Sequence, residues 1–411
     1  MKYGLIGEHL GHSFSKEIHE MLGKYTYEIC EIAKDNLDSF MKEKAFIAIN
    51  VTIPYKQQVI PYLDFIDDKA QSIGAVNTIV NKNNKLYGYN TDYYGLKSLI
   101  QTNDIDVKNK KVLLLGNGGT SKTARTVLKD LQAKEIVIVD INKDENVITY
   151  DDALKYHTDS EIIVNTTPCG MYPDNDGCIV DIELFKNLEA VVDVVYNPIR
   201  TAIVSNSLKK GIKAVSGLYM LVAQAVYAAG IFLDEKILEN EIDRIYNIIK
   251  KQKENIVLIG MPSSGKSTIG IEIAKLLNKE YIDTDSLIEE KINMPISNFL
   301  TKENEDEFRD IEEEIIKNVS KLNNKIISTG GGVIKRNINI KRLKQNAIIV
   351  FIDRSLDKLL TTSSRPLSSN KTDLEKLYHQ RYNIYKSLSD IIVDNNDTLE
   401  DTINKIINEV K

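Results

Sequence analysis

The chain has 411 residues, 42% hydrophobic and 27% charged, which is the balance of an ordinary globular protein with two or three domains. Its formal net charge of -6 excludes the broad basic field of a general nucleic-acid binder. No apolar run approaches the roughly 20 residues of a membrane span, and the first residues lack a secretory signal. The three cysteines, Cys30, Cys169 and Cys178, are too few for a disulfide framework and fit a reducing compartment. We therefore expect a cytoplasmic protein without nucleic-acid or membrane partners.

Short β-branched runs alternate with longer amphipathic stretches, a pattern typical of α/β proteins with parallel sheets. The predicted strands are residues 46–51, 112–115, 136–140, 162–165, 191–195, 256–259, 326–328 and 348–352. Helices are predicted between them, for example at 121–131, 218–232, 267–277 and 305–319. Glycine-rich turns follow the strands that end at residues 115 and 259. Because the N-terminus of a helix attracts phosphate, the two turns predict two nucleotide-binding units.

The first glycine-rich turn is a partial dinucleotide-binding fingerprint. The run GNGGTS at 116–121 follows G-x-G-x-x-[GA], except that a serine stands at the third glycine position. Asp140, 24 residues after the first glycine, ends the next predicted strand, where a Rossmann unit contacts the cofactor ribose. These features predict dinucleotide binding by Gly116, Asn117, Gly118, Gly119, Thr120 and Asp140.

Polar motifs on both sides of this turn carry a family resemblance. Upstream stand HSFS at 12–15 with His19, NVTIPYK at 50–56, AVNT at 75–78 and NTD at 90–92. Downstream stand YNP at 196–198 and GLYMLVAQ at 217–224. In this order, across residues 1 to about 250, the set resembles shikimate dehydrogenase, with a two-lobed fold that contains a Rossmann-like dinucleotide domain.

The resemblance implies a role for each matching residue. Lys56 and Asp92 would form the catalytic pair, since hydride transfer to a ketone makes an alkoxide that needs a nearby proton and positive charge. Gly217 and Met220 would lie near the nicotinamide, whereas His12 and His19 would structure the substrate loop rather than catalyse. The implied substrate-binding residues are Ser13 and Ser15 at the carboxylate, Thr52, Asn77, Asp92 and Gln224 at the ring oxygens, and Tyr196.

The residues after the second Rossmann strand bear on the choice of cofactor. Family members that use NADP(H) usually carry Asn-Arg-Thr there, whereas this chain has DINK at 140–143. A carboxylate at Asp140 would repel a 2′-phosphate and favour the ribose hydroxyls of NAD(H). Lys143, however, could pair with that phosphate. We expect NADP(H), as in the family, with NAD(H) as the alternative.

The second glycine-rich turn is a full P-loop. GMPSSGKS at 260–267 matches G-x-x-x-x-G-K-[ST] and lies between a predicted strand and a predicted helix. Lys266 would neutralise the β and γ oxygens of a nucleoside triphosphate, and the Ser267 hydroxyl would ligate Mg²⁺. The predicted ATP-binding residues are Gly260, Ser263, Ser264, Gly265, Lys266, Ser267 and Thr268.

Further polar residues follow the later strands and helices of this half. They are Asp283 and Asp285, Arg309 with Glu312 one turn later, the glycines at 330–332, Arg365, and Arg381 with Tyr385 four residues on. Together, across 253–411, they resemble shikimate kinase, a P-loop phosphotransferase with a lid. The lid segment at 358–365 is shorter than usual and lacks the arginine often found before Arg365.

This second resemblance implies that Asp285 contacts the substrate hydroxyls as the base and that Asp283 helps to hold Mg²⁺. Arg365, on the lid, would contact ATP and neutralise the transferring phosphate. Planar guanidinium groups suit a carboxylate. The implied shikimate-binding residues are Asp285, Arg309, Gly330, Gly331, Gly332 and Arg381.

The two resemblances name consecutive reactions, which favours one bifunctional enzyme acting on 3-dehydroshikimate and then on shikimate. We predict a substrate-binding domain at 1–95 completed by helices at 217–250, a dinucleotide domain at 96–216 and a kinase domain at 253–411, with a short connection at 250–255. Two alternatives stay open. They are a quinate/shikimate dehydrogenase fused to a kinase, and a regulator that binds these ligands without turning them over.

Overall fold

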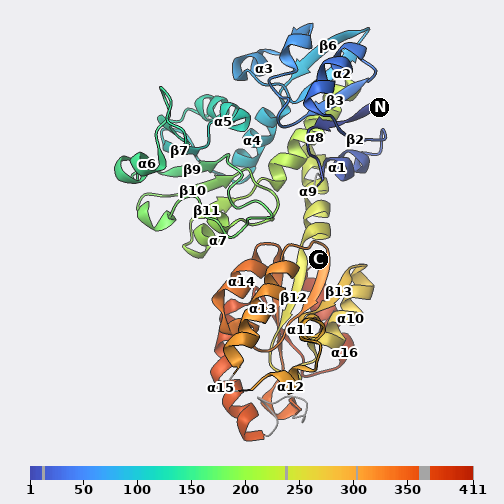
Figure 1. Cartoon of the computed structure of the whole chain (residues 1–411), viewed down its shortest axis with the longest axis vertical. Helices are drawn as coiled ribbons and strands as arrows, with labels where there is room; N and C mark the ends of the chain where they lie inside the picture. The colour runs from blue at the N-terminus through green and yellow to red at the C-terminus, as the bar shows by residue number, and fades with distance from the viewer. Residues whose placement is uncertain (12–13, 237–238, 302–303, 361–370, 411) are drawn as a thin grey trace. The chain divides into compact units, whose positions relative to one another are not determined.

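In the computed structural model, residues 1–11, 14–236, 239–301, 304–360 and 371–410 are described (Figure 1). Contacts divide the chain into two units, Met1–Ile249 and Lys250–Lys411. The dividing point falls within helix α9 (Glu239–Lys253). The residues predicted as a short connection therefore form the last turn of that helix and the start of strand β12 (Asn255–Ile259).

The first sheet of the first unit is mixed. Its order is β2-β1-β3-β5-β6-β4, in which β1 pairs in parallel with β2 and β3, whereas β5 pairs antiparallel with β3 and β6. Only β3 was predicted from the sequence. The strands are β1 (Tyr3–Gly7), β2 (Glu28–Glu31), β3 (Ala48–Val51), β4 (Phe65–Ile66), β5 (Thr78–Lys82) and β6 (Lys85–Tyr89), and the helices are α1 (Ser15–Met21), η1 (Lys34–Asn36), α2 (Leu37–Glu43), η2 (Ile60–Tyr62) and α3 (Asp68–Ile73).

The second sheet of this unit is parallel, in the order β11-β10-β9-β7-β8. Alternate residues of β7 enter two hydrophobic clusters, Val112 and Leu114 in one, Leu113 and Leu115 in the other. Burial on both faces explains the continuous apolar run that predicted this strand. The elements are β7 (Lys111–Leu115), α5 (Gly119–Asp130), β8 (Glu135–Val139), α6 (Tyr150–Tyr156), β9 (Ile162–Asn165), η3 (Ile182–Leu184), β10 (Ala190–Asp193), α7 (Ala202–Lys209) and β11 (Lys213–Val215).

Two helices join the two sheets of the first unit. Helix α4 (Thr91–Thr102) leads from the first sheet into the second, and α8 (Leu218–Leu233) packs against it. Gly95 lets them approach closely, because a Cβ there would lie 2.7 Å from the Met220 carbonyl oxygen. One hydrophobic cluster contains residues of α4, α5, α8 and β7, so the lobes share a core.

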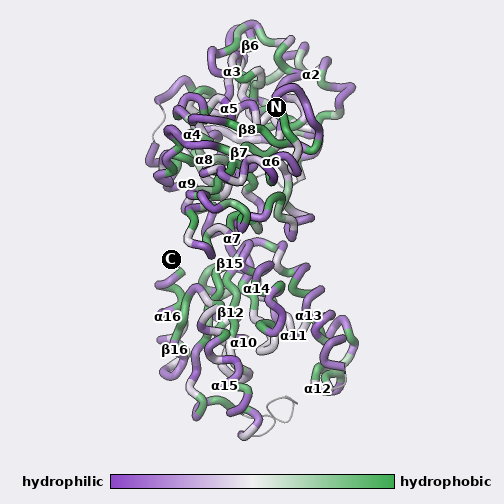
Figure 2. The backbone as a smooth tube through the Cα atoms, turned by 90° about the vertical axis from the view of Figure 1, so that its left-hand side faces the viewer, coloured by the Kyte–Doolittle hydropathy of each residue, from purple (hydrophilic) through white to green (hydrophobic). Residues whose placement is uncertain are grey.

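The second unit is built on one parallel sheet in the order β13-β14-β12-β15-β16. Its strands β12 and β15 are hydrophobic except at Asn255 and Asp353 (Figure 2). Ile256 and Leu258 pack on one face, while Val257 and Ile259 pack on the other. The elements are α10 (Lys266–Leu277), β13 (Glu280–Asp283), α11 (Thr284–Ile292), α12 (Ile296–Phe299), α13 (Glu305–Val319), β14 (Lys325–Ser328), η4 (Val333–Lys335), α14 (Asn337–Lys344), β15 (Ala347–Asp353), η5 (Leu356–Lys358), α15 (Lys371–Leu388), β16 (Ile391–Asp394) and α16 (Leu399–Val410).

The predicted α/β class is confirmed, and each predicted strand matches an observed strand to within two residues at either end. Among the described residues, no helix is long and apolar enough to cross a membrane. The predicted three-part division, with boundaries near residues 95, 216 and 252, stays a prediction.

Candidate active sites

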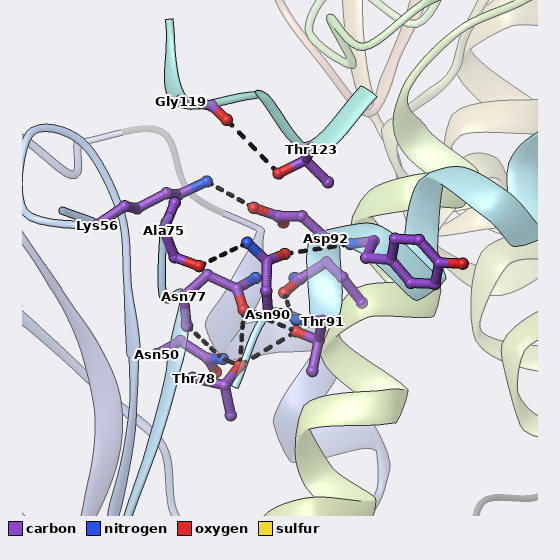
Figure 3. A network of polar contacts seen from close by, with 12 residues as sticks. Asn50, Lys56, Ala75, Asn77, Thr78, Asn90, Thr91, Asp92, Gly119 and Thr123 are labelled. Atoms are coloured by element: carbon purple, nitrogen blue, oxygen red, sulfur yellow. Dashed lines mark hydrogen bonds and ion pairs between the residues drawn. The ribbon is translucent and has the colours of Figure 1, made fainter. Parts of the chain in front are cut away.

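Lys56 and Asp92 meet in the first unit although 36 residues separate them in the sequence. Lys56 Nζ donates a hydrogen bond of 2.6 Å to Asp92 Oδ2, and their side chains are 16% and 11% exposed (Figure 3). Asp92 lies in the first turn of α4, whose N-cap Asn90 accepts a hydrogen bond from the Tyr93 backbone N–H. Asn90 also donates to the Ala75 carbonyl oxygen. The next residue, Val76, donates its N–H to the Lys56 carbonyl oxygen. Asn90 therefore links the first turn of α4, which carries Asp92, to the segment that carries Lys56.

A buried amide network lies next to this pair (Figure 3). Asn77 Oδ1 accepts hydrogen bonds from the Thr91 backbone N–H at 2.7 Å and from Thr78 Oγ1 at 3.0 Å. Asn50 Nδ2 donates to Thr78 Oγ1 and to the Asn77 carbonyl oxygen, and Tyr27 donates to Asn50 Oδ1. Because an amide oxygen has two lone pairs, these donors orient Asn77 and leave its NH₂ group for an acceptor oxygen of a ligand.

The other residues predicted to bind the first substrate come from several elements. Ser15 begins α1, Thr52 directly follows β3, and Gln224 lies in α8, where its Oε1 faces Thr91 Oγ1 at 3.4 Å. Tyr196 follows β10, and its ring meets Phe14 edge-on at 5.4 Å between centroids. Ser13 lies outside the described residues. The remaining members are thus held by α1, by the first sheet, by α4 and α8, and by the end of the second sheet.

The glycine-rich turn after β7 fits a dinucleotide. Gly116 has a φ of +99°, and a Cβ there would lie 2.9 Å from Thr166 Oγ1, so this position requires glycine. Gly118 caps α5 and Gly119 begins it, with Asn117 before them and Thr120 after them. No atom lies within 4 Å of an added Cβ at either glycine, which leaves the helix N-terminus open to a pyrophosphate.

The backbone approaches closely around Gly217, where the sequence analysis expected the nicotinamide. Gly217 caps the N-terminus of α8, and a Cβ there would overlap the carbonyl of Val194. Met220 lies one turn into the same helix and is buried. The sequence prediction that placed these two residues near the cofactor stays a prediction.

Asp193 is a buried carboxylate that the sequence analysis missed. It ends β10, where its Oδ1 accepts hydrogen bonds from Asn165 and from the Val195 N–H, both at 3.0 Å, and its Oδ2 accepts one from Thr201 at 2.5 Å. Burial raises its pKa to about 6 despite these three donors. The group joins the ends of β9 and β10, close to the glycine-rich turn.

Replacing Asp193 with asparagine is expected to change how the stability of the first unit depends on pH. The folded-state pKa lies above the unfolded value of about 3.9, so wild-type stability falls as the pH rises from about 4 to about 6. Asparagine keeps the Oδ1 contacts and does not ionise. Between about pH 4 and pH 6, the unfolding free energy of wild type should therefore fall by on the order of 3 kcal/mol relative to that of the variant. Thermal unfolding from pH 4 to 8 would measure it, with the exposed Asp181→Asn as the control. Parallel profiles for Asp193→Asn and wild type would contradict this expectation.

In the second unit, the P-loop connects β12 to α10. Gly260 and Gly265 have φ values of +151° and +93°, and Ser263, where glycine is common, is also left-handed at +65°. Lys266 begins α10, and its Nζ donates to the carbonyl oxygens of Gly260 and Met261 at 3.1 and 2.9 Å. The turn therefore has the backbone shape and the cation that nucleoside triphosphate phosphates require.

Most of the predicted kinase residues line a cavity of about 620 Å³, a volume typical of ligand sites. Gly260 and Ser264 are absent from its lining. Arg365 lies outside the described residues. The predicted residues that line it are Ser263, Gly265, Lys266, Ser267, Thr268, Asp283, Asp285, Arg309, Gly330, Gly331, Gly332 and Arg381.

One corner of this cavity fits a magnesium ion. Asp283 Oδ2 accepts hydrogen bonds of 2.9 Å from both Ser267 and Tyr281, and its Oδ1 accepts from the Asp285 N–H. A hydroxyl and a carboxylate beside a P-loop are the protein ligands that Mg²⁺ uses when phosphates and waters complete its shell. Among the described residues there is no cluster of three or more His, Cys, Asp or Glu side chains that could bind a metal without them.

Two buried arginines also line this cavity, Arg309 and Arg381. Arg309 Nη1 donates to both oxygens of Glu312 at 2.9 Å, and the two side chains are 6% and 2% exposed. Burial raises the pKa of Glu312, while the charge of Arg309 opposes this rise. Arg381 donates to the Gly331 carbonyl at 2.7 Å, as does Tyr385. The sequence analysis named Glu312 and Tyr385 beside the arginines without assigning them a role. In the structure Glu312 orients Arg309, and Tyr385 shares the Gly331 carbonyl with Arg381.

The fold and the sites define a two-unit α/β enzyme, with a dinucleotide-dependent oxidoreductase unit followed by a P-loop phosphotransferase unit. The chain belongs to the shikimate dehydrogenase family, and a shikimate kinase unit follows. The model of the shikimate dehydrogenase substrate binding domain matches residues 5–79, and that of shikimate kinase matches residues 262–411.

Known proteins support the assignment of the first unit. A shikimate dehydrogenase (NADP(+)) of Clostridium beijerinckii is 39% identical over 266 residues, which cover 61% of this chain and 98% of the relative. The crystal structure of shikimate dehydrogenase 1 from Peptoclostridium difficile is 39% identical, with a TM-score of 0.56, covering 61% of this chain and 98% of that one. The crystal structure of a chorismate mutase/shikimate 5-dehydrogenase fusion protein from Clostridium acetobutylicum is 38% identical, with a TM-score of 0.57. The match covers 60% of this chain and 96% of that one.

Proposed function

We propose that the chain catalyses two consecutive reactions. The first is the reduction of 3-dehydroshikimate to shikimate by a nicotinamide dinucleotide, and the second is the phosphorylation of shikimate at its 3-hydroxyl by ATP with Mg²⁺. The observation that carries this proposal is that one chain combines units of two families that share shikimate as product and substrate. The relatives are named for NADP(+), and the first reaction would use either NADP(H) or NAD(H). The three free cysteines support a cytoplasmic location.

In the first reaction the reduced dinucleotide supplies a hydride to the substrate carbonyl. Negative charge then develops on the carbonyl oxygen, and the Lys56 ammonium group would stabilise this charge and donate the proton. Asp92 would orient the Lys56 ammonium group through their 2.6 Å contact. The NH₂ group of Asn77, oriented by Thr91 and Thr78, would donate to a hydroxyl oxygen of the substrate. Ser13, Ser15, Thr52, Tyr196 and Gln224 would complete the pocket.

In the second reaction ATP supplies the phosphoryl group. Arg309 and Arg381 would bind the shikimate carboxylate, with the Gly330–Gly332 backbone beside them. Asp285, at the other side of this glycine run, would accept the proton of the attacking hydroxyl. Lys266, Arg365 and the magnesium held by Ser267 and Asp283 would compensate the phosphate charge. Phosphoryl transfer depends mainly on such positioning and charge compensation.

Two assays on the full chain test this proposal against its alternatives. Oxidation of shikimate and of quinate, each with NADP⁺ and NAD⁺, measures kcat/KM for the first site, and formation of ADP that depends on shikimate measures the second. We expect shikimate to exceed quinate and ADP to form. A preference for quinate would identify the fused quinate/shikimate dehydrogenase, and the absence of both activities would identify a regulator that only binds.

A further inference from the structure

Asp140 occupies a fixed position at the edge of the dinucleotide site. It directly follows β8, and its backbone N–H donates to the Ile148 carbonyl, so the loop after the strand folds back on the strand end. Its Oδ2 accepts a hydrogen bond of 2.9 Å from the N–H of Asn117, within the glycine-rich turn. Its Oδ1 accepts one of 3.1 Å from the N–H of Asn142. Both oxygens are therefore anchored by backbone amides.

Two of the four or so lone-pair sites of this carboxylate remain for a ligand. A carboxylate can only accept hydrogen bonds, and the adjacent hydroxyls of an unmodified adenosine ribose are donors. A ribose 2′-phosphate offers acceptors and a charge of nearly two negative units instead. The Asp140 carboxylate would thus attract the ribose hydroxyls of NAD(H) and repel the 2′-phosphate of NADP(H).

The loop around Asp140 offers little positive charge to offset this repulsion. Between residues 140 and 152 the chain has five acidic residues and a single basic residue, Lys143. Lys143 is exposed, and its Nζ lies 3.7 Å from Asp152 Oδ2, whose pKa its charge helps to lower. The only cation among residues 140–152 therefore lies near another carboxylate, whereas the sequence left open that it pairs with a 2′-phosphate.

We propose that the dinucleotide domain binds NAD(H) more tightly than NADP(H), and that Asp140 sets this preference by accepting hydrogen bonds from the ribose hydroxyls. This inference rests on the proposed function, and it decides between the two cofactors that the proposed function admits. It also sets this chain apart from relatives named for NADP(+).

Calorimetric titration of the full-length chain with NADH and with NADPH tests the inference by binding rather than by turnover. Wild type should bind NADH about tenfold or more tightly than NADPH. Asp140→Asn should weaken NADH binding and strengthen NADPH binding, so that the ratio of the two dissociation constants moves by about tenfold or more. Asp140→Ser, which removes the carboxylate with a smaller side chain, should move the ratio in the same direction and guards against misfolding of the first variant.

Asp144→Asn is the matched control. Asp144 is an exposed acid of the same loop, and its carboxylate caps the N–H of Glu145 rather than the glycine-rich turn. This variant should leave both dissociation constants within about twofold of wild type. Tighter binding of NADPH by wild type, or equal changes in both constants in the two Asp140 variants, would overturn the inference and leave the dehydrogenase function intact. Failure of wild type to bind either dinucleotide would instead contradict the proposed function.

Discussion

Replacing Lys56 with methionine is expected to lower kcat for hydride transfer by a factor of about 10² to 10⁴, while phosphorylation of shikimate continues at the wild-type rate. Methionine keeps most of the alkyl stem but removes the charge and the proton that the reduced carbonyl oxygen needs. It also leaves Asp92, 11% exposed, without the ammonium group that now lies 2.6 Å away. Initial rates of dinucleotide oxidation and of ADP formation on the same preparation measure the two effects.

Lys42→Met is the control for this experiment. Lys42 belongs to the same lobe and also pairs with an aspartate, Asp38 at 2.8 Å, but it is 68% exposed on α2. Surface pairs of this kind contribute little, so both activities should stay within about twofold of wild type. A Lys56→Met enzyme that keeps more than about a tenth of its hydride-transfer rate would show that Lys56 is not the proton donor.

Replacing Lys266 with methionine is expected to have the reverse effect, with phosphorylation lowered by about 10²-fold or more and hydride transfer unchanged. Lys266 is the cation of the P-loop, and its ammonium group is directed at the Gly260 and Met261 carbonyls, within the turn that would surround the phosphates. Methionine fills the same buried volume but cannot compensate phosphate charge. ADP formation at saturating ATP and shikimate gives the loss in kcat.

Lys275→Met serves as the matched control because Lys275 lies on the same helix, α10, where it is 65% exposed and paired with Glu272. It should leave both activities near the wild-type level. Loss of hydride transfer in Lys266→Met, with Lys275→Met normal, would mean that the two units do not work independently.

The two glycine-rich turns could be predicted from the sequence because their cause is local. A buried strand delivers the chain to a turn, the turn needs glycine where φ is positive, and a helix begins directly after it. Gly116 at +99° and Gly265 at +93° are observed in this conformation. The strands before both turns are buried on their two faces, so they read as continuous apolar runs.

The first sheet was largely missed for a physical reason. It is mixed, with short strands such as β2 and β4 that carry exposed or half-buried residues rather than apolar runs. Its polar residues are equally hard to read. Nothing in the spacing of Lys56 and Asp92 predicts that they meet, and only the resemblance to a family suggested the pair. Thr78 and Asn50, which orient Asn77, stood in recognised motifs without being assigned a role.

Contacts over long sequence distances account for the other residues that were missed. Asn395, after β16, donates to the Ser264 carbonyl at 2.7 Å and accepts from Thr402, so the end of the chain holds the P-loop in place. Asp193 likewise joins residues from two strands and a helix. An asparagine or an aspartate at a strand end is common, and only the fold shows what each one contacts.

The central claim is that one chain carries both reactions, and a single coupled reaction tests it most directly. The purified full-length protein would be given 3-dehydroshikimate, a reduced nicotinamide dinucleotide and ATP with Mg²⁺, and the products identified by mass. We predict that 3-dehydroshikimate disappears, that shikimate 3-phosphate accumulates, and that dinucleotide oxidation and ADP formation reach equal amounts. Dinucleotide oxidation that stops at shikimate without ADP formation, or no consumption of 3-dehydroshikimate at all, would contradict the claim.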